Sequence, residues 1–244
     1  MADTNTSNAT LSSVGMRGKL SDRDNRVYES IPSAGWDRQG AWSSEAALAT
    51  AMLGRVCGLP MKDMTQLMDE QPSSRRLDTL IRGLANGDIY HRLWTESAKA
   101  RLRASMTLHS LAAQEPLRQP LPSYDWRRFE SFMVAELSGG SREMFMALFL
   151  DTQYRLLSAE VLFMGSVDCA PVYTRVVASR ALAHQSSSVV VAHNHPSGTL
   201  TPSHSDVAVT QKLSKALMLL DIRLLDHLIV ADGRCLSLRN LGFV

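Results

Sequence analysis

The second half of the chain predicts an α/β fold with a β-sheet covered by helices on both faces, because short apolar runs alternate there with amphipathic stretches. Before it, from Ser44 onward, apolar residues recur at intervals of three and four, which predicts a small all-α domain. The first residues are rich in Ser, Asn, Asp and Arg, a composition typical of a disordered tail. We therefore expect a disordered tail at 1–40, a helical domain at 41–115, a linker at 116–124 and an α/β domain at 125–244.

The helical domain is expected to consist of several amphipathic helices. The pattern that begins at Ser44 is interrupted at Gly58-Leu59-Pro60 and then resumes. Further helical stretches are predicted near 75–85 and 95–113. Three prolines between 116 and 122 then favour a linker over another helix.

The α/β domain is expected to begin with a helix that ends before two glycines and to continue with alternating strands and helices. Asp232-Gly233 is a typical hairpin turn between the last two strands. In chain order, the predicted elements are a helix at 126–137, strands at 143–150 and 154–165, a helix at 172–185, a strand at 188–193, a helix at 202–220 and strands at 224–231 and 235–238.

The composition is that of a globular protein without a strong electrostatic signature. Of the 244 residues, 45% are hydrophobic, which is ample for a buried core. Through residue 125 there are 15 Lys and Arg against 14 Asp and Glu, and afterwards 11 against 10, which gives the total of +2. Neither half is a basic domain, so charge gives little support to strong nucleic-acid binding.

Cysteine usage and hydropathy favour a cytoplasmic protein. Cys57, Cys169 and Cys235 are far apart, which argues against a disulfide framework or a cysteine zinc site. The sequence contains no apolar run long enough for a membrane span and no signal-peptide pattern at its start. We therefore expect no membrane association.

The residues that follow the apolar run Val189-Val190-Val191-Ala192 predict a catalytic zinc site. His193 and His195, two apart on a strand, would point to one face, about 6 to 7 Å apart along it, so both imidazoles can bind one ion. Asp206 would add a carboxylate oxygen and leave a fourth position open, as in catalytic zinc sites. The cofactor predicted is Zn²⁺.

The same segment has an alternative and compatible interpretation. Ser203-x-x-Asp206 before an apolar periodic stretch is the pattern of a capping box at a helix N-terminus. A helix that begins there would hold Asp206 in place, while the loop from Pro196 to Pro202 returns it towards the histidines.

Several motifs together resemble the RadC family, a bacterial branch of the JAMM (MPN, MPN+) metalloprotease-like domains. They are H-N-H-P-S-G at 193–198, T-P-S-x-x-D at 201–206 and L-D-H-L-I-V at 225–230, preceded by matches at 142–151 and 160–166. The resemblance covers roughly residues 125 to 244. It implies a mixed central β-sheet flanked by helices.

The resemblance also implies an activity and a set of site residues. His193, His195 and Asp206 would bind Zn²⁺, Glu143 would act as general base, and the Ser203 hydroxyl would stabilise the developing oxyanion. The expected activity is zinc-dependent hydrolysis of a peptide or isopeptide amide bond, with water activated by the metal and a peptide or protein as substrate.

The helical domain resembles, in degenerate form, the helix-hairpin-helix that precedes RadC cores. The similarity lies in 93–102, but where that motif has Gly-x-Gly this chain has Leu93 and Thr95 around Trp94, whose side chains would obstruct a phosphate. A small structural bundle is therefore expected. If this domain contacts DNA weakly, we expect the contact to be made mainly by three basic residues of the next helix, Lys99, Arg101 and Arg103.

The sequence also bears on two other classes of function. A non-enzymatic DNA-repair or DNA-processing accessory that keeps the RadC fold, with or without the metal, is the alternative. A zinc nucleobase deaminase is excluded because H-x-E with a downstream P-C-x-x-C does not occur. Two further histidines stay outside the predicted site, since His204 is expected to be exposed and His227 to be buried in a strand.

Overall fold

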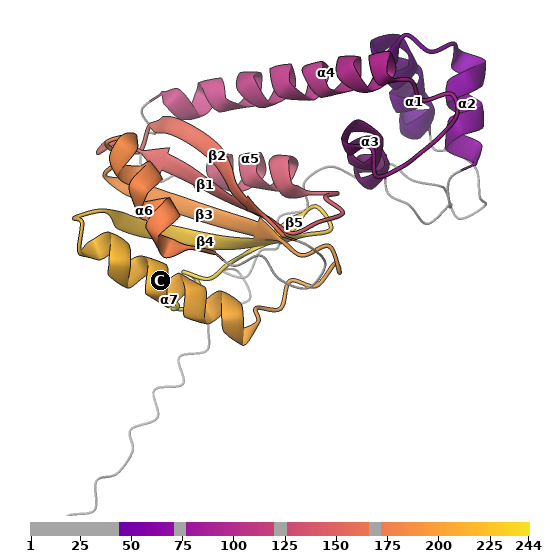
Figure 1. The fold of residues 1–244 in the computed structure, drawn as a ribbon. Coiled ribbons are helices and arrows are strands. Elements are labelled where there is room, and N and C mark those ends of the chain that lie inside the picture. The colour runs from indigo at the N-terminus through magenta and orange to yellow at the C-terminus, as the bar shows by residue number, and fades with distance from the viewer. Residues whose placement is uncertain (1–43, 71–76, 120–125, 166–171) are drawn as a thin grey trace, which may run out of the picture.

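The computed structural model describes residues 44–70, 77–119, 126–165 and 172–244 (Figure 1). The tail expected at 1–40, Cys169 and most of the expected linker lie outside these residues. Among the described residues, no helix combines the length and the apolar character needed to cross a membrane.

The first part of the chain is all-α, as expected. Its helices are α1 (Ser44–Cys57), α2 (Met61–Asp69), α3 (Leu77–Asn86) and α4 (Glu96–Gln114). They enclose a hydrophobic core of their own, in which Trp94 is 5% exposed and donates its indole N–H to the carbonyl of Leu84 at 2.8 Å. Trp94, at the centre of the predicted degenerate hairpin, is thus a core residue.

The second part is built on a mixed five-stranded sheet in the order β2-β1-β3-β4-β5. Its strands are β1 (Met144–Leu150), β2 (Leu156–Met164), β3 (Ser188–Asn194), β4 (Arg223–Ala231) and β5 (Arg234–Ser237). Among the described strands only the β3–β4 pair is parallel, and a parallel pair requires a crossover connection, which here contains α7 (His204–Met218). The α/β fold class predicted from the sequence is confirmed.

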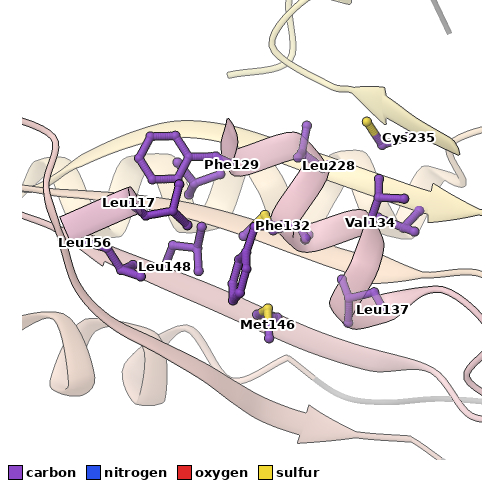
Figure 2. Packing of buried hydrophobic residues seen from close by; sticks show 14 of the residues in the cluster. Leu117, Phe129, Phe132, Val134, Leu137, Met146, Leu148, Leu156, Leu228 and Cys235 are labelled. Carbon is purple, nitrogen blue, oxygen red and sulfur yellow. The ribbon is translucent and has the colours of Figure 1, made fainter. Parts of the chain in front are cut away.

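Helices cover both faces of the sheet. α5 (Arg127–Leu137) lies on one face, and α6 (Thr174–Ala183) and α7 lie on the other (Figure 1). Side chains alternate along β1 because successive residues of a strand point to opposite faces. Figure 2 shows Met146 and Leu148 packed with Phe132 and Leu137 of α5. Phe145 and Phe149 belong to the core beneath α6 and α7.

The chain between α4 and α5 departs from the expected linker at its start. Glu115–Arg118 form a 3₁₀ helix, η1, and Leu117 within it is 1% exposed in the core of the α/β part (Figure 2). The prolines misled the sequence prediction because Pro116 is compatible with the first turn of a helix. The rest of the division into domains stays a prediction.

The helical part contacts the segment that leads into β1. Ser141 Oγ donates to a carboxylate oxygen of Asp88 at 2.6 Å, and Asp88 lies in the loop after α3. Arg82 on α3 donates to the carbonyl of Ala135 near the end of α5. These contacts join the helical part to the last turn of α5 and to the turn between α5 and β1.

The packing of η1 makes a testable prediction. Leu117→Ala should lower the free energy of unfolding by about 2–5 kcal/mol, the usual effect of removing a buried leucine side chain. Leu111→Ala on α4 is the control, since Leu111 is 54% exposed. Denaturant unfolding of the two variants and the wild type measures the difference, and equal stabilities would mean that residues 115–118 act as a linker after all.

Candidate metal centre

The two histidines of the predicted site are delivered by the end of β3. His193 pairs with Phe145 of β1 and Ile229 of β4, and the N–H of His195 continues the ladder by donating to the carbonyl of Val230 at 2.8 Å. Both imidazoles point to the same side, with ring centroids 4.8 Å apart. The Nε2 atoms of the two rings are 2.9 Å apart. The spacing of two residues on a strand had predicted that both rings lie on one face.

Asp206 reaches the histidines from the first turn of α7, where the predicted capping box is present. Its Oδ2 accepts from the backbone N–H and from the hydroxyl of Ser203, both at 2.7 Å. This leaves Oδ1 3.1 Å from Nε2 of His193. Burial by itself raises the pKa of Asp206, but the nearby His193 and His195 side chains and the hydrogen bonds from Ser203 outweigh it and hold that pKa well below its usual range.

The ring of His193 is held by a chain of buried hydrogen bonds that begins on α7. The hydroxyl oxygen of Thr210 lies 2.6 Å from the backbone carbonyl oxygen of Asp206 and 2.6 Å from Nδ1 of His227. Nε2 of His227 lies 2.8 Å from Nδ1 of His193. His227 is 1% exposed, and burial lowers its pKa well below the ordinary value, so this ring is neutral.

The proton positions follow from the acceptor at the end of this chain. The Asp206 carbonyl only accepts, so the Thr210 hydroxyl donates to it, and the Thr210 oxygen accepts from Nδ1–H of His227. Nε2 of neutral His227 then accepts from Nδ1–H of His193. Nε2 of His193 therefore carries a lone pair, which faces Nε2 of His195 at 2.9 Å.

His195 is oriented in the same sense by a backbone group. Its Nδ1 lies 2.8 Å from the carbonyl oxygen of Thr199, which only accepts, so Nδ1 carries the proton. When the ring is neutral, Nε2 faces Asp206 with a lone pair. The hydrogen bond with the Asp206 carboxylate raises the pKa of His195.

These atoms form a donor set that fits a zinc ion. His193, His195 and Asp206 are a group whose ligand atoms all lie within 4.8 Å of one another. Lone pairs that face one another repel unless a cation lies among them. Without a metal a proton has this role, which agrees with the raised pKa of His195. Two imidazole nitrogens and one carboxylate oxygen are ligands of catalytic zinc, with a fourth position for water or substrate.

Glu143 immediately precedes β1 and lines the same cavity as the three ligand candidates. The cavity has a volume of about 370 Å³. The carbonyl of Glu143 accepts from the N–H of Gly165 at 2.8 Å, and its side chain is half-buried. Besides the four residues named, the cavity is lined by Met144, Phe145, Val172, Ser197, Thr199, Thr201, Ser203, Ser205, Val209 and His227.

The structure thus brings all five residues predicted for the site to one cavity, while their roles stay predictions. His204 is exposed, as expected. His227 was left out of the site, yet it contacts His193 directly, and Thr210 was missed altogether. The signals for His227 in the sequence are its place in an apolar strand and in the L-D-H-L-I-V motif, and its partner became visible only when β4 paired with β3.

Comparisons with known proteins agree with this fold and site. A family model for the RadC-like JAB domain matches residues 124–243. A UPF0758 protein of Marinomonas sp. (strain MWYL1) is 40% identical over 211 residues, which cover 84% of this chain and 91% of that protein. A UPF0758 protein of Alcanivorax borkumensis is 42% identical over 146 residues, 60% of this chain and 65% of that protein. One of Cellvibrio japonicus is 49% identical over 113 residues, 46% of this chain and half of that protein.

The mixed sheet and the His-His-Asp group at the end of β3 define a JAB (MPN) domain, which is a metallohydrolase-type fold. The chain belongs to the RadC family, and the resemblance inferred from its motifs is confirmed. The name UPF0758 states no activity.

The donor set predicts metal content directly. The purified protein should bind about one zinc ion per chain, and His193→Ala should abolish this binding because a three-ligand site loses one ligand. His204→Ala is the control, since His204 is an exposed neighbour of the same loop and helix. Elemental analysis of the dialysed proteins measures both, and equal zinc in wild type and His193→Ala would remove His193 from the ligand set.

The hydrogen-bond chain behind His193 predicts a weaker effect from a residue that touches no metal. Thr210→Val keeps the shape of the side chain but removes the acceptor for Nδ1–H of His227, so His193 loses its fixed orientation. We expect zinc affinity to fall about tenfold to a hundredfold, as for other partners of metal-binding histidines.

The control for this variant is Thr107→Val, because the Thr107 hydroxyl also donates to the carbonyl four residues earlier but lies on α4. Competition with a chromophoric chelator measures the affinity. Unchanged affinity in Thr210→Val would mean that the chain of hydrogen bonds does not orient His193.

Proposed function

We propose that this protein is a zinc-dependent hydrolase of the JAMM/RadC type that cleaves a peptide or isopeptide amide bond. The observation that carries the proposal is the convergence of two imidazole Nε2 atoms and one carboxylate oxygen in a cavity that Glu143 also lines. When bound, zinc polarises a carbonyl group and lowers the pKa of water.

The roles of the protein's own residues follow from their positions. His193 and His195 bind as neutral ligands through Nε2, and Asp206 binds through Oδ1 because Ser203 occupies Oδ2. Glu143 acts as general base, accepting a proton from the attacking water and passing it to the leaving amine. Neutral ligands and a single carboxylate leave the zinc site with a net positive charge.

The lining of the cavity supports an uncharged scissile group. Among the described residues that line it there is no lysine or arginine, so apart from the proposed zinc ion a phosphate would find no cation to pair with and would meet the carboxylate of Glu143. One part of the lining is apolar, with Met144, Phe145 and Val209, and another carries hydroxyl groups. This combination suits a peptide main chain better than a nucleic-acid backbone.

Ser203 has two proposed uses that compete for one proton. Its hydroxyl lies 2.7 Å from Oδ2 of Asp206, and its oxygen accepts from the N–H of Asp206 at 3.1 Å. To stabilise an oxyanion, this hydroxyl would have to turn away from Asp206. We therefore propose that Ser203 orients Asp206 in the resting protein and turns to the substrate only when an oxyanion forms.

A substitution of the proposed base tests the reaction. Glu143→Gln should keep about one zinc per chain and lower the rate of hydrolysis by a factor on the order of a hundred or more, because the amide cannot accept the proton. Glu136→Gln on α5 is the control, since Glu136 is also half-buried but lies outside the cavity. The measurement combines zinc content with turnover of a fluorescence-quenched peptide library, a glycyl-lysine isopeptide, and single- and double-stranded DNA.

The outcomes separate the hydrolase from the alternative. Cleavage of a peptide or isopeptide that depends on zinc and Glu143 supports the proposal. Loss of zinc in Glu143→Gln would make Glu143 a ligand instead of a base. If the zinc-loaded wild type cleaves none of these amides but binds duplex DNA more tightly than about 10⁻⁶ M at physiological salt, the DNA accessory replaces the hydrolase.

A further inference from the structure

Asn194, the last residue of β3, lies between His193 and His195 and has a buried polar side chain that the reaction outlined above does not use. It is 3% exposed. Successive residues of a strand point to opposite faces, so Asn194 points away from the face on which His193 and His195 meet. A buried carboxamide requires partners for its oxygen and its nitrogen.

Those partners are the backbone groups on either side of Glu143. The N–H of Met144 donates to Oδ1 of Asn194 at 2.7 Å. Nδ2 of Asn194 donates to the carbonyl of Arg142 at 3.0 Å. The two hydrogen bonds enclose Glu143 in the sequence, and its own carbonyl is held by Gly165 at 2.8 Å.

A glycine makes room for this carboxamide. A Cβ atom added at Gly140 would lie 3.1 Å from Nδ2 of Asn194, which is a tighter contact than side chains normally make. It would also lie 2.8 Å from the terminal methyl of Met144, which is flexible enough to move. Gly140 therefore matters to the position of the Asn194 amide.

We propose that Asn194 is a positioning residue, whose carboxamide holds the backbone of Glu143 so that the carboxylate faces the metal site; this rests on the proposed function, in which Glu143 is the base. Three consecutive residues at the end of β3 and just after it then set both halves of the site. His193 and His195 place the metal, and Asn194 places the base relative to it. A general base must lie within hydrogen-bond reach of its proton, and a displacement of about 1 Å lowers rates on the order of a hundredfold.

The first test needs no substrate. Asn194→Ala should increase the rate of hydrogen exchange at the Met144 amide by at least about tenfold, because its acceptor is removed. In the protein loaded with Co²⁺ in place of zinc, the paramagnetic shift of the Glu143 side-chain resonances should change, since this shift depends on the position of Glu143 relative to the metal. Zinc content should stay at about one per chain.

The second test uses the peptide or isopeptide probes described above. Asn194→Ala should lower kcat about tenfold to a hundredfold and leave KM within about twofold, because the base moves while the cavity that binds substrate does not. Gly140→Ala should have the same effect in weaker form, since its new methyl group displaces the Asn194 amide without removing it. This second variant keeps the test open if Asn194→Ala fails to fold.

Ser186→Ala provides a matched control. The Ser186 hydroxyl is also buried and donates to a backbone carbonyl, that of Ala181 at 3.0 Å, but Ser186 lies before the opposite end of β3. Its loss should destabilise the protein without moving the Met144 exchange rate, the Glu143 shift or kcat.

The outcomes distinguish this inference from the proposed function. Unchanged exchange and an unchanged Glu143 shift in Asn194→Ala overturn the inference whether or not the protein is a hydrolase. If exchange and the Glu143 shift both change in Asn194→Ala but the wild type cleaves none of the probes, the placement of Glu143 by Asn194 is supported and the hydrolase is not. Equal effects of Asn194→Ala and Ser186→Ala on kcat would assign Asn194 a purely structural role.

Discussion

β3 lies in the middle of the sheet, antiparallel to β1 and parallel to β4, with helices over both of its faces. Its residues Ser188–Asn194 are all buried. A strand that is paired on both edges and covered on both faces cannot change register without exposing apolar side chains and breaking two ladders of hydrogen bonds. The rigidity of His193, Asn194 and His195 is therefore a property of the whole sheet, and the candidate site inherits it.

The polar side chains at the end of β3 lie in apolar surroundings, where they require specific hydrogen-bond partners. The His193 ring stacks on Phe145 of β1, with the ring centroids 6.4 Å apart. Its Nδ1 contacts His227 of β4. In such an apolar environment an unpaired donor or acceptor is costly, so each proton of the chain from Thr210 to His193 has one favourable position. The protein thereby selects the form of His193 that can bind a metal. No charged group is needed for this selection.

The start of α7 has an equivalent role for the carboxylate. A capping box satisfies backbone N–H groups that every helix leaves free, and here its acidic member is also a ligand candidate. Because Ser203 occupies Oδ2, the other oxygen of Asp206 is directed to the histidines. The helix is in turn fixed to the sheet by Thr210, which contacts His227. Helix capping, the proposed metal binding and the packing of α7 on β4 thus depend on the same few residues.

Local patterns in the sequence were sufficient for the fold class, most elements and the grouping of His193, His195 and Asp206, because strand alternation and capping act over a few neighbouring residues. Glu143 could be included only by family resemblance, since fifty residues separate it from His193. The packing of Leu117, and the contacts of His227, Thr210 and Asn194, were decided by the tertiary structure alone. Each depends on which strands become neighbours and which face a helix covers, and hydrogen bonds between residues far apart in the chain leave no periodic signal in it.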